Sequence, residues 1–410
     1  MRIVVYEHVS GGAYAGQPIK PGILSEGFGM LRTATSDFKA AGHEVTVLLY
    51  YRLSKLNPPI DADYTVPIFS SQETKKFLTT IAKINDGVYI IAPEKGKTLQ
   101  SLVALIEKTG KVSLNCESNS IEKVADKTVL YEILKKNGLP TPEIVTLTVE
   151  GTVAEVKRAI KETFSYPVIF KPINGVSCDG LRIIREDAQV EKAIDELKAK
   201  SARKCFIVQD FVSGEASSVS LLSTGCNALA ISLNKQNVNI AEADAFSSYE
   251  GGVVPFDHSL KQEAFSVAEK VVRCFPGLRG YVGVDFVLAA DKLFVVDVNP
   301  RLTTSYIGLS KTVNFNIAES IVNAVVKGRL PAKVEHNGFV CFSKVETPKP
   351  TLRAFQKAAQ LKEVISPPFP LDDSNGSCAL VAGQASSVDN ARLRFEEAKK
   401  RLTNIICRGK

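Results

Sequence analysis

The sequence predicts a multidomain protein of the α/β and α+β classes: a parallel α/β domain, a larger α+β region and a small C-terminal domain. Three observations predict this. The chain has 410 residues, which exceeds the roughly 250 to 300 that one hydrophobic core can serve. Short β-branched runs alternate with helical patterns over 1–115. Helices then mix with antiparallel-type strands over 116–330, and Pro-rich turns mark a change of character at 331–410.

The first domain is predicted from its strand–helix–strand order. Apolar runs at 3–6 and 44–50 flank a helical pattern at 26–41, which ends at Gly42. Glycine suits the left-handed position that follows a helix. The same pattern recurs with a strand at 88–92 and a helix at 99–107. Such alternation is typical of a parallel sheet covered by helices.

The central region is predicted to form two α+β lobes. A helix is expected over 117–137, because Gly138 and two prolines follow it. A second helix at 259–275 carries an apolar stripe with i, i+3, i+4 spacing. The expected strands are 167–171, 205–211, 217–222, 228–233, 281–288 and 293–298. The tail is read as a small appended domain, with a strand near 379–381 and a final helix at 390–402.

Composition excludes several classes of protein. The net charge of +7 comes from 51 basic and 44 acidic residues spread along the chain, without the clustered basic and aromatic residues of a nucleic-acid site. The eight cysteines form no C-x-x-C pair, and no run approaches 18 apolar residues. We therefore expect a cytoplasmic protein without nucleic-acid or membrane partners. The oligomeric state stays open, with a homodimer as one option.

Two acidic strands near the end of the central region point to a metal site. Asp297 and Asn299 alternate onto one face of a strand, and Asp285 on the neighbouring strand can join them. Two carboxylates and an amide are oxygen donors suited to Mg²⁺, or to Mn²⁺ in its place. The alternative is a strand that simply ends in an Asn-Pro turn.

Lysines beside turns suggest a phosphate site. Lys171 ends a strand and precedes a loop that contains Gly175 and Gly180, whose backbone N–H groups can fold over phosphates. Lys127 opens a helical stretch and can reach the same phosphates. A single lysine is usually a solvated surface residue. The strand-to-loop segment 209–215 offers backbone groups for a base edge and a carboxylate for ribose hydroxyls.

Taken in this order, these elements resemble the ATP-grasp superfamily, and the preceding α/β domain resembles its pre-ATP-grasp companion. The resemblance implies an ATP-grasp fold with ATP and Mg²⁺ as cofactors. It implies phosphate contacts from Lys127 and Lys171, adenine contacts from Gln209, Asp210 and Val212, a ribose contact from Glu215, and metal ligands Asp285, Asp297 and Asn299.

The sequence departs from the superfamily pattern at three positions. Many members carry glutamate where this chain has Gln209 and Asp297, and arginine where it has Gly283. The missing arginine leaves Arg301 as the expected cation near the transferred phosphate. Arg301 and Lys171 are therefore the predicted catalytic residues.

Within the superfamily, several stretches resemble the archaeal tyramine-L-glutamate ligases of methanofuran biosynthesis. These stretches are 6–12, 25–31, 92–94, 233–236, 249–252 and 299–304. The resemblance implies an ATP-dependent ligase that forms an acyl phosphate from a small carboxylate and passes it to a small amine. The alternatives are another ATP-grasp ligase, of the purine-pathway or carrier-protein type, and a non-catalytic ATP-binding module. The C-terminal domain resembles that of carboxylases and purine-pathway members. Candidate substrate-pocket residues are Glu7, 10–12, Glu94, Asn234, Gln236, Tyr249 and Thr303.

Overall fold

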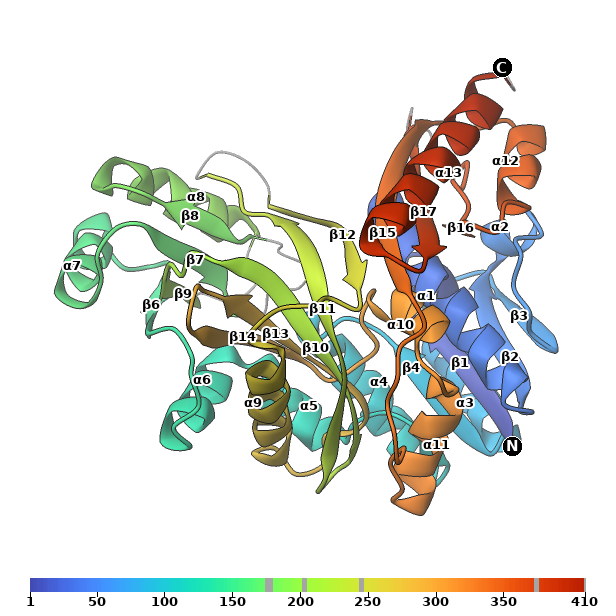
Figure 1. The fold of residues 1–410 in the computed structure, drawn as a ribbon, viewed down its shortest axis with the longest axis horizontal. Helices are drawn as coiled ribbons and strands as arrows, with labels where there is room; N and C mark the ends of the chain where they lie inside the picture. The colour runs from blue at the N-terminus through green and yellow to red at the C-terminus, as the bar shows by residue number, and fades with distance from the viewer. Residues whose placement is uncertain (174–179, 201–204, 243–246, 372–375, 409–410) are drawn as a thin grey trace.

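The computed structural model describes residues 1–173, 180–200, 205–242, 247–371 and 376–408. These residues form three β-sheets with helices around them (Figure 1). The predicted combination of a parallel α/β domain with α+β lobes is confirmed.

The first sheet is parallel and has the strand order β3-β2-β1-β4-β5. Its central strands β1 and β4 are buried and mainly apolar, apart from the exposed Arg2 and the buried Glu7 at the ends of β1, as expected when helices cover both faces of a parallel sheet. The strands are β1 (Arg2–Glu7), β2 (Glu44–Tyr50), β3 (Tyr64–Ile68), β4 (Gly87–Ile91) and β5 (Val112–Ser113). The helices are α1 (Pro21–Ala40), α2 (Tyr51–Ser54), α3 (Thr74–Ile84) and α4 (Thr98–Glu107). The sequence analysis did not identify β3, whose first residues are exposed.

The second sheet has four antiparallel strands in the order β6-β9-β7-β8. Its strands are β6 (Ile144–Thr148), β7 (Val168–Pro172), β8 (Arg182–Ile184) and β9 (Cys205–Asp210). Helices α7 (Val153–Thr163) and α8 (Val190–Lys200) pack on this sheet through their own small core, and Figure 1 shows this lobe apart from the N-terminal sheet. The lobe therefore has a core of its own.

The third sheet has eight strands in the order β14-β13-β10-β11-β12-β15-β17-β16. They are β10 (Glu215–Thr224), β11 (Ala228–Asn239), β12 (Ser248–Val254), β13 (Arg279–Leu288), β14 (Leu293–Asn299), β15 (Phe339–Pro348), β16 (Val364–Ser366) and β17 (Gly376–Ala385). The sheet thus joins strands of 116–330 to strands of 331–410. The division of the chain at 115/116 and 330/331 stays a proposal based on sequence.

The pairing of β12 with β15 joins the two parts of this sheet. Its register runs from Gly251 opposite Ser343 to Val254 opposite Val340. A Cβ at Gly251 would lie 2.1 Å from the carbonyl oxygen of Phe342, so only glycine permits this approach of the two backbones.

The single helix predicted over 117–137 is wrong in one respect, because the chain forms two helices there. α5 (Ser118–Ala125) ends before Asp126, and α6 (Lys127–Lys136) begins after it. The Asp126 carboxylate accepts hydrogen bonds from the backbone N–H groups of Thr128 and Val129, as an N-cap does. The break places Lys127 at the start of α6.

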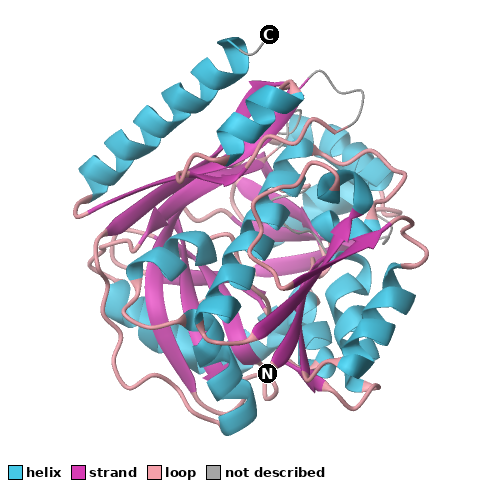
Figure 2. Ribbon diagram, turned by 90° about the vertical axis from the view of Figure 1, so that its right-hand side faces the viewer, coloured by secondary structure: helices cyan, strands magenta, loops and turns pink. Residues whose placement is uncertain are grey.

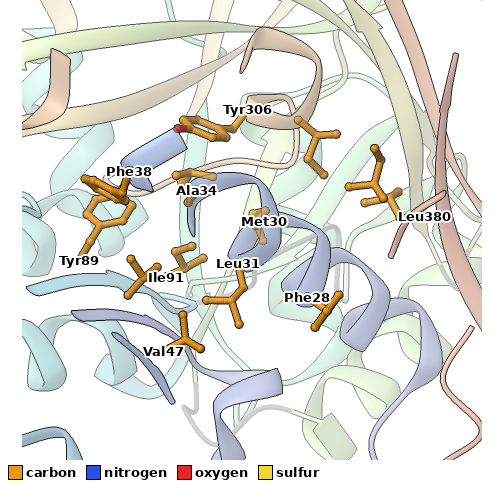
Figure 3. Close-up of a cluster of buried hydrophobic side chains, with 14 of the residues drawn as sticks. Phe28, Met30, Leu31, Ala34, Phe38, Val47, Tyr89, Ile91, Tyr306 and Leu380 are labelled. Atoms are coloured by element: carbon orange, nitrogen blue, oxygen red, sulfur yellow. The ribbon is translucent and has the colours of Figure 1, made fainter. Parts of the chain in front are cut away.

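Helix α1 lies between the parallel sheet and the eight-stranded sheet. Figure 3 shows Phe28, Leu31 and Phe38 of α1 among side chains from both sides. Val47 and Ile91 come from the parallel sheet, and Tyr306 and Leu380 come from the other side. Because α1 buries side chains on both faces, it ties the N-terminal domain to the C-terminal strands.

The remaining helices pack against the eight-stranded sheet and α1. They are α9 (Lys261–Arg273), α10 (Tyr306–Thr312), α11 (Ile317–Lys327), α12 (Leu352–Ala359) and α13 (Val388–Arg408). Among them, α10 is mostly buried. α13 packs along β15 and β17, and Figure 2 shows it as the long helix that leads to the C-terminus. Within the described ranges, no helix is both long enough and apolar enough to cross a membrane.

A buried carboxylate, Asp37 of α1, predicts how stability depends on pH. It accepts hydrogen bonds from Tyr306 Oη at 2.6 Å and Ser310 Oγ at 2.9 Å. Burial raises the pKa of Asp37 from 3.8 to about 6, although the two hydrogen bonds act in the opposite direction. The folded chain then binds more protons than the unfolded chain between about pH 4 and pH 6, so this carboxyl lowers the free energy of unfolding as pH rises through that window.

Asp37→Asn is expected to remove this effect. The free energy of unfolding of the variant, relative to wild type, should increase by roughly 2 to 3 kcal/mol between about pH 4 and pH 7. Urea unfolding at several pH values measures it, with the exposed Asp195→Asn as the control. A difference between Asp37→Asn and wild type that stays constant over this range would contradict the prediction.

Candidate active site

A cavity of about 240 Å³ lies between the four-stranded sheet and the eight-stranded sheet, and the N-terminal domain closes one end. Its wall combines polar residues from all three parts of the fold. The polar lining residues are Glu26, Glu94, Lys127, Lys171, Gln209, Gln236, Tyr249, Asp285, Asp297, Asn299, Arg301, Thr303, Thr304 and Ser305. The site is therefore built by packing of the domains and not by one motif.

The three predicted metal ligands meet on adjacent strands. Asp285 of β13 lies directly opposite Asp297 of β14. Asn299 Nδ2 donates to Asp285 Oδ2 at 2.9 Å, and Gln236 Nε2 donates to Asp285 Oδ1 at 3.1 Å. Burial and then the neighbouring Asp297 charge raise the pKa of Asp285 to about 6. Two carboxylates held this close favour a bound cation, which would relieve their repulsion.

The chemistry of these donors fits a hard divalent cation such as Mg²⁺. All three side chains offer oxygen, the donor that this class of ion prefers. The described part of the chain holds no group of three or more His, Cys, Asp and Glu residues able to bind a metal. With two carboxylates and one amide, the site suits an ion that completes its coordination with water and phosphate oxygens.

Two lysines lie at this end of the cavity. Lys127 Nζ is 2.5 Å from Asp297 Oδ2, which the break between α5 and α6 makes possible. Lys171 Nζ donates to Gln209 Oε1 at 2.5 Å across the pairing of β7 with β9. Burial, and then the nearby Lys127 charge, lower the pKa of Lys171 to about 7. A buried cation with this pKa gains strongly from an anionic ligand.

An apolar slot adjoins the lysines. Its side chains come from both sheets and from the segment after β9, and they suit a flat aromatic group. They are Ile169, Leu181, Phe211, Val212, Ala216, Val238, Ile240, Phe286, Val287, Val296 and Val298.

Arg301 lines the same cavity and is held by an acid of the N-terminal domain. Its Nε is 2.9 Å from Glu94 Oε1 and donates to Glu94 Oε2 at 3.1 Å. Burial lowers the pKa of Arg301, but Glu94, Asp285 and Asp297 outweigh burial and leave it raised. Arg301 therefore stays charged.

The structure also gives a reason for the glycine at position 283. A Cβ at Gly283 would lie 2.7 Å from the methyl carbon of Thr303. Thr303 Oγ1 in turn hydrogen-bonds Tyr281 Oη at 3.0 Å, which fixes its position. An arginine at this position would displace Thr303, and Arg301 lines the same cavity.

Other predicted residues lie outside this wall. Glu215 is half exposed and forms an ion pair with Lys235 at 3.0 Å. The backbone N–H group of Asp210 donates a hydrogen bond to the Glu143 carbonyl oxygen. Gly180 lies in a turn next to cavity-lining Leu181. Gly175 lies outside the described residues. The roles of these four stay predictions.

The candidate substrate residues divide in the same way. Glu94, Gln236, Tyr249 and Thr303 line the cavity. Glu7 is buried beside the cavity and accepts hydrogen bonds from the backbone N–H and the hydroxyl group of Ser10. Asn234 is buried beneath the sheet surface, where its Nδ2 donates hydrogen bonds to the hydroxyl groups of Ser218 and Ser220.

Glu26 is a site residue that was not among those predicted from the sequence. Glu26 comes from α1 and lines the cavity beside Thr304. A signal was present, because Gly27 and Gly29 follow it within one turn of a helix. Glycines inside a helix often mark close approach of another element.

Comparison with known proteins identifies relatives over most of the chain. A family model for the ATP-grasp domain matches residues 124–305, and one for the pre ATP-grasp 3 domain matches residues 43–121. Tyramine–L-glutamate ligase of Methanocaldococcus fervens is 30% identical over 322 residues, which are 78% of this chain and 93% of that protein. The Methanocaldococcus jannaschii protein of the same name is 28% identical over 278 residues, 67% of this chain and 74% of that protein.

Solved structures share the fold of this chain, among them a biotin carboxylase domain. The biotin carboxylase domain of Hydrogenobacter thermophilus 2-oxoglutarate carboxylase, in complex with MgADP, aligns with a TM-score of 0.70 at 14% identity. The alignment covers 97% of this chain and 89% of that chain.

Proposed function

The chain belongs to the ATP-grasp family and is an ATP-dependent carboxylate–amine ligase, and from this premise we propose that it joins an amino acid such as glutamate to an amine such as tyramine. The observation that carries the proposal is the meeting of Lys127 and Lys171 with Asp285, Asp297 and Asn299 in one cavity between two sheets. The substrate pair rests on the 30% identity with a tyramine–L-glutamate ligase over nearly its whole length.

In the proposed mechanism, the lysines hold the nucleotide phosphates. Lys171 Nζ donates a hydrogen bond to Gln209 Oε1 at 2.5 Å, so the terminal amine of Lys171 is oriented before a ligand arrives. Lys127 can exchange its carboxylate partner Asp297 for a phosphate. A divalent cation on Asp285, Asp297 and Asn299, for which we propose Mg²⁺, would neutralise phosphate charge during transfer.

Arg301 is the residue that we assign to the reacting carboxylate. Of its five N–H donors, one goes to Glu94 and one to the Leu302 carbonyl oxygen at 3.1 Å. The others can bind the substrate carboxylate, and later the oxyanion that forms when the amine attacks the acyl phosphate. Glu94 acts as a positioning residue, because it fixes the guanidinium from the other domain.

The apolar slot is the proposed adenine site, with Gln209 and Val212 at its edge. A cytoplasmic location remains a prediction of the sequence. A homodimer likewise remains a proposal.

A panel assay tests the proposed function. ADP release is measured with ATP and magnesium against pairs of amino acids and amines, and the product is identified by mass spectrometry. Glutamate with tyramine should give stoichiometric ADP and one amide product. The substrate proposal would be contradicted if no amino acid supported ADP release while carboxylate–amine pairs without an amino acid did.

The lowered pKa of Lys171 predicts proton uptake on nucleotide binding. At pH 8 this amine is mostly neutral, since burial lowers its pKa to about 7. Phosphate oxygens favour the ammonium form, so binding a non-hydrolysable ATP analogue should take up roughly half to one proton at pH 8. Asp285, with a pKa of about 6, is already ionised there and contributes little.

Calorimetry in buffers of different ionisation enthalpy measures this uptake. Lys171→Met should bind more weakly and lose the uptake, whereas Lys161→Met, on the exposed surface of α7, should keep it. Equal uptake by wild type and Lys171→Met would show that another group titrates.

A further inference from the structure

A second pair of opposite charges lies at the end of the cavity away from Lys171. Glu26 of α1 and Lys344 of β15 form an ion pair of 2.7 Å, with side chains only 14% and 24% exposed. Glu26 lines the cavity, as do Tyr249 of β12 and Thr304. Three separate parts of the chain, the N-terminal domain, the central region and the tail, thus meet at this point.

The surroundings of the pair are those of a small polar subsite. Thr304 Oγ1 donates to Glu26 Oε2 at 3.5 Å, and Lys344 Nζ lies 6.0 Å from the centre of the Tyr249 ring. The side chain of Lys344 runs along α1 at Gly22, where a Cβ would approach its Cδ to 3.6 Å. The anion Glu26 therefore lines the cavity, and the cation Lys344 is bonded to it from the adjoining strand β15.

Stability alone gives a weak reason for this pair. Taking two charges out of water costs free energy that their attraction repays poorly, and apolar residues of similar size often stabilise as well or better. Most of the buried contact between α1 and the C-terminal strands is apolar, in the cluster that holds Met30 and Leu380 (Figure 3), although Ser25 and Arg32 of α1 also form hydrogen bonds to β17 and β16. Burial also raises the pKa of Glu26 against the opposing effect of Lys344. A charged pair here suits a ligand better than it suits packing.

We propose that Glu26 and Lys344 form the subsite for the α-amino acid, with its ammonium group on Glu26 and its α-carboxylate on Lys344. An α-amino acid carries an ammonium group and a carboxylate on the same carbon. The bound zwitterion can therefore replace the ion pair between Glu26 and Lys344 with two ion pairs, one to each side chain. The Tyr249 ring adds a face for the bound cationic group. The inference rests on the proposed function, and it makes strand β15 of the C-terminal region a direct part of the substrate site.

The first experiment separates recognition from structure with four variants. Glu26→Gln and Lys344→Met remove one charge each, and the double variant Glu26→Lys with Lys344→Glu restores an ion pair with reversed polarity. Lys39 lies elsewhere on α1 and forms an ion pair with Asp63. Lys39→Met removes this cation and serves as the matched control. Melting temperature, and KM for glutamate, tyramine and ATP, are measured for each.

Both single variants should raise the KM for glutamate at least tenfold while the KM for ATP changes less than twofold. The reversed pair should recover the wild-type melting temperature but not the glutamate KM. Lys39→Met should leave all three KM values unchanged. Recovery of the glutamate KM by the reversed pair, or an unchanged KM in both single variants, would overturn the proposal and assign the pair to structure.

Substrate analogues assign each charge to its partner. Wild type should discriminate against N-acetylglutamate and against the α-amide of glutamate. Glu26→Gln should lose the preference for glutamate over N-acetylglutamate. Lys344→Met should lose the preference for glutamate over its α-amide. If wild type turns over glutamate but both variants keep both preferences, the subsite is wrong and the proposed function stands. If wild type turns over no amino acid, both are wrong.

Discussion

Asp297→Asn is expected to abolish ligation while the chain stays folded. The substitution replaces a carboxylate with a neutral amide of the same shape, in a set of donors that has only two carboxylates. It also removes the partner of Lys127, which lies 2.5 Å away. We expect turnover to fall by at least about a thousandfold, the scale on which loss of a main transition-state charge contact acts.

Substrate-dependent ADP release and thermal melting of the same samples test this prediction. Asp291→Asn is the matched control, since Asp291 is an exposed acid in the turn that joins β13 to β14. Full activity of Asp297→Asn with an unchanged melting curve would leave Asp297 as a polar strand residue. Activity lost at every magnesium concentration, with the fold intact, would support the metal site.

Lys171→Ala is the second change with a large expected effect. The lysine is 9% exposed, held by Gln209, and lies among apolar residues that exclude water. Losing one preorganised charge of this kind costs about 2 to 4 kcal/mol of transition-state stabilisation, or roughly 30-fold to 1000-fold in turnover. The melting temperature should change little, because a buried ammonium with a lowered pKa stabilises the free enzyme poorly.

Steady-state turnover and thermal melting are compared for this variant and for Lys161→Ala, whose side chain is 64% exposed. The control should match wild type in both measurements. Turnover of Lys171→Ala within twofold of wild type would remove Lys171 from the reaction.

Local patterns were sufficient to predict the hairpin that carries the three candidate metal ligands. Side-chain alternation places Asp297 and Asn299 on one face, and their neighbour Asp285 follows from the short turn between the strands. The structure has this register, with Asp285 opposite Asp297. What the sequence could not provide was the distance between Lys127 and Asp297, which are separated by 170 positions.

Contacts between distant segments account for most of what the sequence could not predict. The break at Asp126 has no glycine or proline to mark it. The sequence indicated a helical stretch that opens at Lys127, but the end of α5 before Asp126 became clear only in the structure, where the Asp126 side chain caps α6. The pair formed by Glu26 and Lys344 joins residues far apart in the chain, and no periodicity connects them. Glu94 likewise reaches Arg301 only through packing of the first domain on the second.

The pairing of β12 with β15 has a consequence for how the chain can be divided. A protein ending at residue 330 would keep β11 on one side of β12 but leave the other side of β12 without a neighbour. The backbone N–H and C=O groups that now bond to β15 would become an open edge, which other chains can extend by adding strands. We expect such a truncated protein to self-associate, so the tail protects solubility as well as completing the sheet.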